Sequence, residues 1–275
     1  MTNTKIGVLR FMITKTIDLI GNLAINILNQ IISILEFIGE CISALIKSVY
    51  YLFTGKVSLK KTIEQAALIG ADSVGIALVI IFITGGVISL QLARYFYMSG
   101  GEAYVGGLVS IVVIRELAPV FTALVISARA GTAIASELGN MQITEQVDAM
   151  KTLNVNPIKY LVLPRVLASA IVVPLVAVLA IVIGVFGGMA VAKLSINLHQ
   201  NRFLNSVWLY TATKDLYICI IKSFVFGIAL SLVCSIRGLK TKGGARDVGK
   251  AVTSSAIWTT VVILILDYLV TWIMA

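Results

Sequence analysis

Four ionisable residues interrupt a long apolar stretch at about 105–138: Arg115, Glu116, Arg129 and Glu137. If such a stretch lies in a membrane, its charges are costly, and they usually pair or face a water-filled cavity. Arg115 and Glu116 are adjacent, so on a helix they point about 100° apart. We predict that Glu116, with Arg115 and Arg129, lines a cavity or gate. The alternative, which we favour for Glu137, is that these side chains only anchor helix ends and pair with neighbours.

The same stretch carries a stripe of small residues at four-residue spacing: Ala123, Ser127, Gly131 and Ala135. Small residues on one helix face let two helix backbones approach closely in a membrane bundle. The stripe therefore predicts tight helix packing, and it does not by itself point to an activity.

The composition requires a lipid-facing surface. Hydrophobic residues make up 59% of the 275 residues and charged residues only 13%, whereas soluble domains carry roughly 25% charged residues. Five apolar segments are long enough to cross a bilayer, at about 72–93, 105–138, 160–192, 216–236 and 251–274. We predict an all-α integral membrane protein with about five transmembrane helices in one membrane domain, residues 55–275.

Residues 1–54 form a region of different character. Polar residues recur every three or four positions from Lys15 to Lys47 between isoleucines, leucines and phenylalanines. A helix in the membrane plane keeps such a polar stripe in water, so we predict an N-terminal interfacial amphipathic helix. The alternative is a lone span whose polar face packs on the bundle.

Lysines and arginines predict the orientation. With five spans, three basic segments share one side: Lys47, Lys56, Lys60, Lys61, Lys151, Lys159, Arg165, Arg237, Lys240, Lys242, Arg246 and Lys250. Cytoplasmic loops carry an excess of Lys and Arg. We therefore predict a cytoplasmic N-terminus and an outward-facing C-terminus. The net charge of +9 reflects this loop bias rather than nucleic-acid binding.

The loop at 140–158 is too polar to span a membrane. Val147, Met150 and Leu153 recur on one helical face, whereas Glu145 and Asp148 lie on other sides. A short amphipathic helix on the cytoplasmic side suits docking into a groove of a partner. The alternative is a helix that lies on lipid headgroups.

Several other chemistries are excluded. The single histidine, His199, and three cysteines without CxxC spacing predict no metal site. The segment Gly244–Lys250 fits GxxxxGK, but Ala251 follows where a phosphate-binding loop needs Ser or Thr for Mg²⁺. A membrane span, not a strand, precedes it. We therefore predict no ATPase in this chain. If the protein uses ATP, a partner must bind ATP and Mg²⁺ and hydrolyse the ATP.

Several motifs together resemble the MlaE family of permeases over roughly residues 55–275. They are Arg115-Glu-Leu-Ala-Pro-Val120, Ala128-Arg-Ala-Gly131, Glu137-Leu-Gly139, Thr144-Glu-Gln-Val-Asp-Ala149, Asn156-Pro157, Leu161-Val-Leu-Pro-Arg165 and Gly243-Gly-Ala-Arg-Asp-Val-Gly249. The first 54 residues match only in their amphipathic character.

The resemblance implies the membrane subunit of an ABC transporter that moves phospholipids or related lipids between inner and outer membranes. It implies a homodimer in the inner membrane of a double-membraned bacterium or in a plastid inner envelope. A separate ATPase would bind at a coupling helix, residues 143–153, with Glu145 and Asp148 holding that subunit. A periplasmic MCE-domain protein would conduct the lipid. Two alternatives to a lipid permease remain: a stand-alone channel or secondary transporter, and a membrane scaffold.

Overall fold

The computed structural model describes residues 2–54, 57–98 and 100–274, with side chains described from residue 25 onward except for residue 27. The chain divides into two units, Met1–Ile46 and Lys47–Ala275. The prediction of an all-α membrane protein is confirmed: the described residues contain no strand, and five of their helices are long and apolar enough to cross a membrane.

The first unit is helical and belongs to helix α1 (Thr2–Thr54). Isoleucines and leucines such as Ile25, Leu28 and Leu35 are exposed there, and so are the polar residues Asn29 and Glu36. The start of the predicted polar stripe, from Lys15 to Asn22, lies outside the residues whose side chains are described. That the helix lies in the membrane plane stays a prediction.

The second unit is a helical bundle. After the end of α1 come the short helix α2 (Leu59–Gly70) and the first span α3 (Val74–Met98). The second span is continuous from Glu102 to Ile143 and the third from Ile158 to Ile196. The fourth and fifth are α10 (Thr213–Leu239) and α11 (Ala245–Met274). All five lie at the predicted positions, and most extend further than predicted, because flanking polar residues continue the helices.

The second span changes its helical pitch twice. It consists of η1 (Glu102–Tyr104), α4 (Val105–Val112), the π-helical turn η2 (Val113–Leu117), α5 (Ala118–Ile126), the π-helical turn η3 (Ser127–Gly131) and α6 (Thr132–Ile143). In η2 the Ala118 N–H donates to the carbonyl of Val113, five residues earlier. Pro119 has no N–H, so the carbonyl of Arg115 loses its ordinary helical donor. Such π-turns often occur at functional sites.

The third span combines the π-helical turn η4 (Ile158–Val162) with α8 (Leu163–Ile196), and α8 packs most closely against α3 and α10. Helices α8 and α3 touch backbone to backbone, because a Cβ added at Gly85 or Gly187 would overlap the carbonyl oxygens of Gly184 and Phe82. Glycine is needed at these crossings since no side chain fits.

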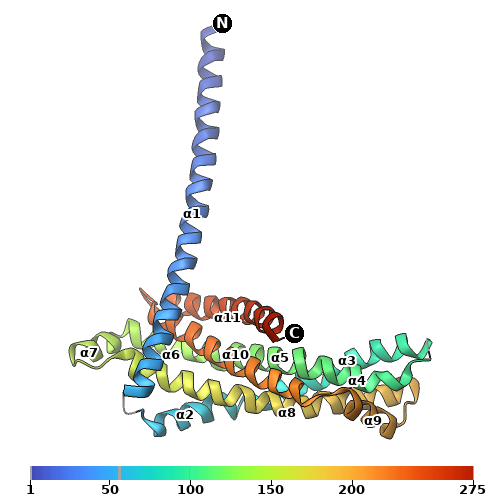
Figure 1. The fold of residues 1–275 in the computed structure, drawn as a ribbon. Coiled ribbons are helices and arrows are strands. Elements are labelled where there is room, and N and C mark those ends of the chain that lie inside the picture. Colours follow the sequence, from blue (N-terminus) through green and yellow to red (C-terminus); the bar gives the residue numbers. More distant parts are fainter. Residues whose placement is uncertain (1, 55–56, 99, 275) are drawn as a thin grey trace. The chain divides into compact units, whose positions relative to one another are not determined.

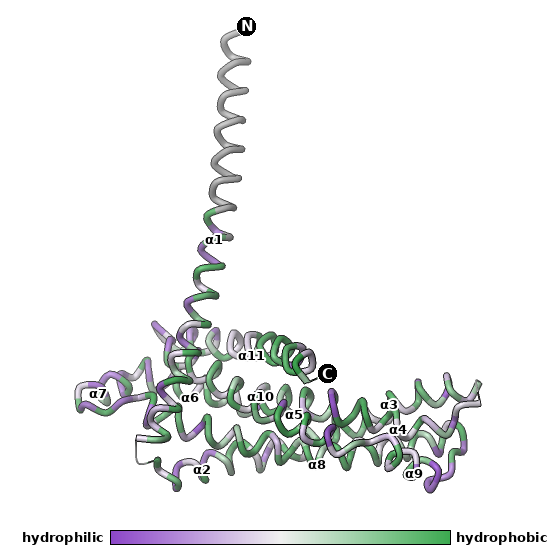
Figure 2. The backbone as a smooth tube through the Cα atoms, viewed as in Figure 1, coloured by the Kyte–Doolittle hydropathy of each residue, from purple (hydrophilic) through white to green (hydrophobic). Residues whose placement is uncertain are grey.

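Polar residues gather outside the spans. Helix α7 (Gln146–Thr152) follows the second span, and α9 (Gln200–Tyr210) follows the third. Figure 2 shows hydrophilic residues on α7 and hydrophobic ones along α8 and α10, and Figure 1 shows where these helices lie. Since the bundle surface keeps many exposed leucines, isoleucines and phenylalanines, it suits a hydrocarbon environment.

Candidate functional site

The charges of the second span meet partners on the fourth and fifth spans. Lys222 of α10 lies 2.8 Å from Glu116 Oε2 and 2.8 Å from Asp267 Oδ1 of α11. Its side chain is fully buried, whereas that of Glu116 is 41% exposed. We call Glu116, Lys222 and Asp267 the Lys222 cluster. One buried ammonium thus forms ion pairs with two carboxylates, and the carboxylate of Glu116 is partly exposed.

The π-turn supplies a further ligand for Lys222. Its Nζ donates a hydrogen bond to the backbone carbonyl of Arg115 at 2.9 Å. This is the carbonyl that Pro119 leaves without a helical donor. Because an unpaired buried carbonyl costs free energy, the ammonium stabilises the π-turn while the turn helps to hold the ammonium.

Arg115 joins a second ion pair on the same face of α10. Its Nε and Nη2 each lie 2.6 Å from Asp215 Oδ1, and Asp215 is almost fully buried. Asp215 Oδ2 also accepts the Ala212 N–H at 2.9 Å, which caps the start of α10. Asp215 and Lys222 are two helical turns apart. Adjacent residues of the second span therefore reach two levels of the fourth span.

Arg129 and Glu137 lie elsewhere. Arg129 pairs with Asp72, just before α3, and its Nη1 donates to Ser73 Oγ at 3.3 Å. Glu137 Oε2 lies 2.8 Å from Nη2 of Arg165, which is 3% exposed. Arg165 Nη1 also donates to the carbonyl of Leu161 at 2.7 Å. The structure does not bring Arg129 together with Arg115 and Glu116, and both outer pairs tie the second span to other helices.

The small-residue stripe is buried throughout. Ala123 and Ala135 are fully buried, Ser127 nearly so, and a Cβ on Gly131 would lie 2.8 Å from Cys234 Sγ of α10. The stripe therefore faces the bundle interior, where it lets α10 come close.

An apolar groove of about 470 Å³ opens beside the Arg115–Asp215 pair. Its walls come from the second and third spans, α9 and the start of α10, and include Ile114, Val185, Phe186, Trp208 and Leu216. Ile114 and Leu216 are the sequence neighbours of Arg115 and Asp215. Ala212 also lines the groove, and its N–H donates to Asp215, the partner of Arg115. The groove is therefore uncharged but lies beside an ion pair, an arrangement suited to an amphiphilic ligand.

The predicted docking helix is α7, and its residues divide between two environments. Val147 is 2% exposed and Met150 packs on the same hydrophobic core. Glu145, Asp148 and Leu153 are exposed, and Leu153 shows 76% of its surface. Asp148 pairs with Lys151 at 2.7 Å. A partner would therefore meet the carboxylates and Leu153, while Val147 and Met150 attach α7 to its own bundle.

The segment after α7 is held by residues that precede the first span. Asn156 Nδ2 donates to the hydroxyl of Tyr51 at 2.8 Å. The Lys61 ammonium lies 2.9 Å from the centre of the Tyr160 ring. These contacts connect the end of α1 and helix α2 to the chain between α7 and α8.

Lys222, Asp267, Asp215 and Arg165 were not among the predicted site residues. Lys222 and Asp267 stand inside apolar runs, so the criterion that selected Arg115 and Glu116 would also have selected them. Asp215 stands at a predicted span end, where a carboxylate is ordinary. Among the described residues, no group of three or more His, Cys, Asp or Glu side chains could hold a metal ion.

Comparison with known proteins decides the family. Residues 62–273 match the family described as permease MlaE. The chain belongs to the MlaE permease family. A probable ABC transporter permease of Synechocystis is 37% identical over 82% of this chain and 85% of its own length. One of Rickettsia prowazekii is 34% identical over 94% of this chain and 98% of its own.

A plant relative belongs to the same set. The chloroplastic protein TRIGALACTOSYLDIACYLGLYCEROL 1 of Arabidopsis thaliana is 32% identical over 79% of this chain and 62% of its own length. As a member of a family of ABC transporter permeases, the chain is a transport subunit rather than an enzyme, and it works in a membrane with an ATPase subunit. This family assignment argues against the two alternatives, a stand-alone channel or secondary transporter and a membrane scaffold.

Proposed function

We propose that this permease moves phospholipids or related lipids between the inner and outer membranes. The observation that carries the proposal is the Lys222 cluster with the half-exposed carboxylate of Glu116. Glu116 is two residues from Ile114, which lines the uncharged groove. Charges within a span usually mark a substrate path. A lipid needs both features, since its headgroup is polar and its chains are not.

The groove supports an apolar substrate. Its volume of about 470 Å³ lies within the range of roughly 300–1,000 Å³ usual for small-molecule sites. Valine, isoleucine, phenylalanine and leucine side chains form most of its walls. The name of the Arabidopsis relative contains that of a galactolipid, which agrees with a lipid substrate here.

The transporter is proposed to contain two copies of this chain, each with one cytoplasmic ATPase subunit, below a periplasmic MCE-domain protein. The second half of α11 supports a second copy, because Tyr268, Trp272 and Ile273 are exposed there although the same helix contributes Asp267 to the Lys222 cluster. The membrane is the inner membrane of a double-membraned bacterium or a plastid inner envelope. The excess of lysine and arginine in the loops on one side supports an N-terminus in the cytoplasm or stroma.

ATP binding and hydrolysis act on the lipid cavity through α7. In this proposal Glu145, Asp148 and Leu153 contact the ATPase, and Val147 and Met150 transmit its movement to the core. The partner holds ATP and Mg²⁺. Closure of the two ATPases moves both α7 helices, which changes the width of the cavity around Glu116.

The test is lipid transfer by the purified transporter in liposomes. Glu116→Ala should abolish ATP-dependent transfer of a fluorescent phospholipid while the ATPase stays bound. Glu64→Ala removes an exposed carboxylate of α2 and should leave transfer unchanged. Normal transfer by Glu116→Ala would remove Glu116 from the lipid path. Loss of the ATPase from this variant would assign Glu116 to assembly instead.

A further inference from the structure

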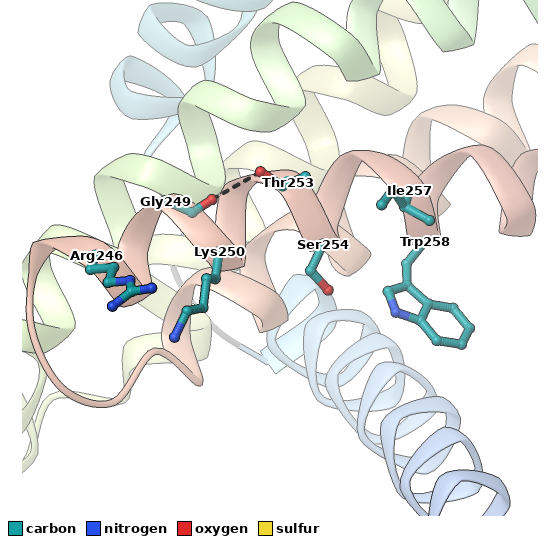
Figure 3. Close-up of a pocket in the computed structure, with 7 residues that line it drawn as sticks. All are labelled: Arg246, Gly249, Lys250, Thr253, Ser254, Ile257 and Trp258. Atoms are coloured by element: carbon teal, nitrogen blue, oxygen red, sulfur yellow. Dashed lines mark hydrogen bonds between the residues drawn. The ribbon is translucent and has the colours of Figure 1, made fainter. Parts of the chain in front are cut away.

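A second pocket lies along the first half of α11, and it shares no lining residue with the apolar groove or with the Lys222 cluster. It has a volume of about 560 Å³ and lines one face of the helix (Figure 3). Its lining includes Arg246, Lys250, Thr253, Ser254, Ile257 and Trp258. Steps of four residues connect Arg246, Lys250, Ser254 and Trp258, so these side chains follow one another along the helix.

The chemistry of the pocket changes in order along the helix axis. Two cations stand at the start of α11, two hydroxyl side chains follow, and Ile257 and Trp258 come last. At 1.5 Å per residue the series covers roughly 18 Å. A phospholipid has the same order of groups, from its phosphate through its ester-linked glycerol to its acyl chains.

The charge at the start of the pocket favours an anion. Lys250 pairs with Asp247 at 2.7 Å. Arg246 is exposed and makes no ion pair within the part of the chain that the structure describes. The side chains of Arg246, Lys250 and Asp247 together carry one net positive charge. The guanidinium of Arg237 also lies over the Trp258 ring, 5.2 Å from its centre, which helps to hold the ring in place.

A soluble nucleotide or phosphate fits this pocket less well. Ala251 follows Lys250 in the GxxxxGK-like segment, and Lys250 already lies within a helix that begins at Ala245. Such an anion also has no apolar part that could cover Ile257, whose side chain is 59% exposed. Basic residues next to a membrane span commonly bind anionic lipid headgroups.

We propose that this face of α11 binds an anionic phospholipid of the surrounding leaflet, with its phosphate at Arg246 and Lys250 and an acyl chain along Ile257 and Trp258. The site is separate from the transport path at the Lys222 cluster. Its assignment to the cytoplasmic leaflet rests on the orientation in the proposed function, but the binding itself does not.

Tryptophan quenching by brominated lipids tests the site directly. The transporter, with its ATPase bound, is placed in nanodiscs that contain brominated-chain phosphatidylglycerol or phosphatidylcholine. This chain carries Trp208→Phe and Trp272→Phe, and a matched variant with Trp258→Phe gives the signal to subtract. One net positive charge near the surface contributes about 1 kcal/mol to the binding of an anionic lipid. Brominated phosphatidylglycerol should therefore reach half-maximal quenching of Trp258 at a roughly fivefold lower mole fraction than brominated phosphatidylcholine.

Arg246→Gln should make the two lipids quench equally. Lys242→Gln removes a cation from the loop just before α11, outside the pocket, and should keep the difference. Equal quenching by the two lipids in the chain that keeps Arg246 would overturn the proposal, as would loss of the difference when inorganic phosphate is added at constant ionic strength. No quenching by either lipid would mean that a protein surface covers the pocket. Because no transport is measured, these outcomes are independent of the transport proposal.

Discussion

Lys222 donates a hydrogen bond to the backbone carbonyl of Arg115, 2.9 Å away, across the contact between the fourth and second spans. Pro119 leaves this carbonyl without its helical donor, and the same ammonium binds Glu116 and Asp267. One side chain therefore connects three spans and stabilises the π-turn that presents Glu116.

Replacing Lys222 should destabilise the bundle strongly. Lys222→Met leaves two carboxylates without their cation and the Arg115 carbonyl unpaired. Breaking a buried ion pair by removing one partner costs about 3–5 kcal/mol. The midpoint of thermal unfolding of the purified protein should fall clearly. Adding Glu116→Gln and Asp267→Asn should recover part of the loss, because the uncompensated charges are then gone. No recovery would show that the cost comes from packing.

The Glu137–Arg165 pair should be asymmetric. Arg165 is buried and also binds the carbonyl of Leu161, so Arg165→Gln should cost about 1.5–3 kcal/mol. Glu137 is half exposed, and a glutamine there keeps an acceptor oxygen for the buried guanidinium, so Glu137→Gln should cost less than Arg165→Gln although the carboxylate charge is lost. Thermal unfolding of both variants measures the difference. Equal effects would contradict the role assigned to Arg165.

The contact between α3 and α8 should tolerate no side chain at Gly187. In Gly187→Ala the new methyl overlaps the Phe82 carbonyl, and such overpacking costs about 1–3 kcal/mol. Gly75→Ala on α3 is the matched control, because a Cβ there meets nothing within 4 Å. A lower unfolding midpoint is expected for Gly187→Ala alone. An unchanged midpoint would mean that the two helices can separate freely.

Two substitutions around α7 should separate docking from folding. Leu153→Asp changes an exposed side chain, so the unfolding midpoint should hold while less ATPase co-purifies. Val147→Asp places an unpaired carboxylate in the core, so its midpoint should fall. Full retention of the ATPase by Leu153→Asp would remove this residue from the interface.

The reversal of charge at Glu145 and Asp148 tests the other half of that surface. Both carboxylates are exposed, so replacing them with lysine should leave the bundle folded and release the ATPase. The measurement is the amount of ATPase that co-purifies with the chain. Lys151→Glu, which alters the partner of Asp148, shows whether a general change in charge has the same effect.

Hydropathy and length were enough to place the five spans, because each apolar run is long and unambiguous. They did not place the ends, since Arg94, Glu137 and Lys193 lie within helices that continue past them. The ionisable residues of one span could be recognised as unusual. Lys222 and Asp267 could have been recognised in the same way, but their pairing with Glu116 could not, because it depends on which helices are neighbours. The π-turn at Val113–Leu117 likewise depends on a cation from another span.

The burial of α7 residues shows the same limit. A helical period selected Val147, Met150 and Leu153 as one face, but it could not tell which of them meets the chain's own core. The structure buries Val147 and leaves Leu153 exposed. The interaction between Tyr51 and Asn156 had no signal in the sequence, because it joins residues far apart in the chain.

The lipid-permease proposal is tested most directly by affinity purification of the chain without detergent, followed by an ATPase assay with and without phospholipid. The proposal predicts that an ATPase co-purifies, that phospholipid changes its turnover, and that Glu116→Ala reduces this response while the ATPase stays bound. Co-purification of an ATPase whose turnover is the same with and without phospholipid would contradict a lipid substrate, although the chain would remain an ABC transporter permease.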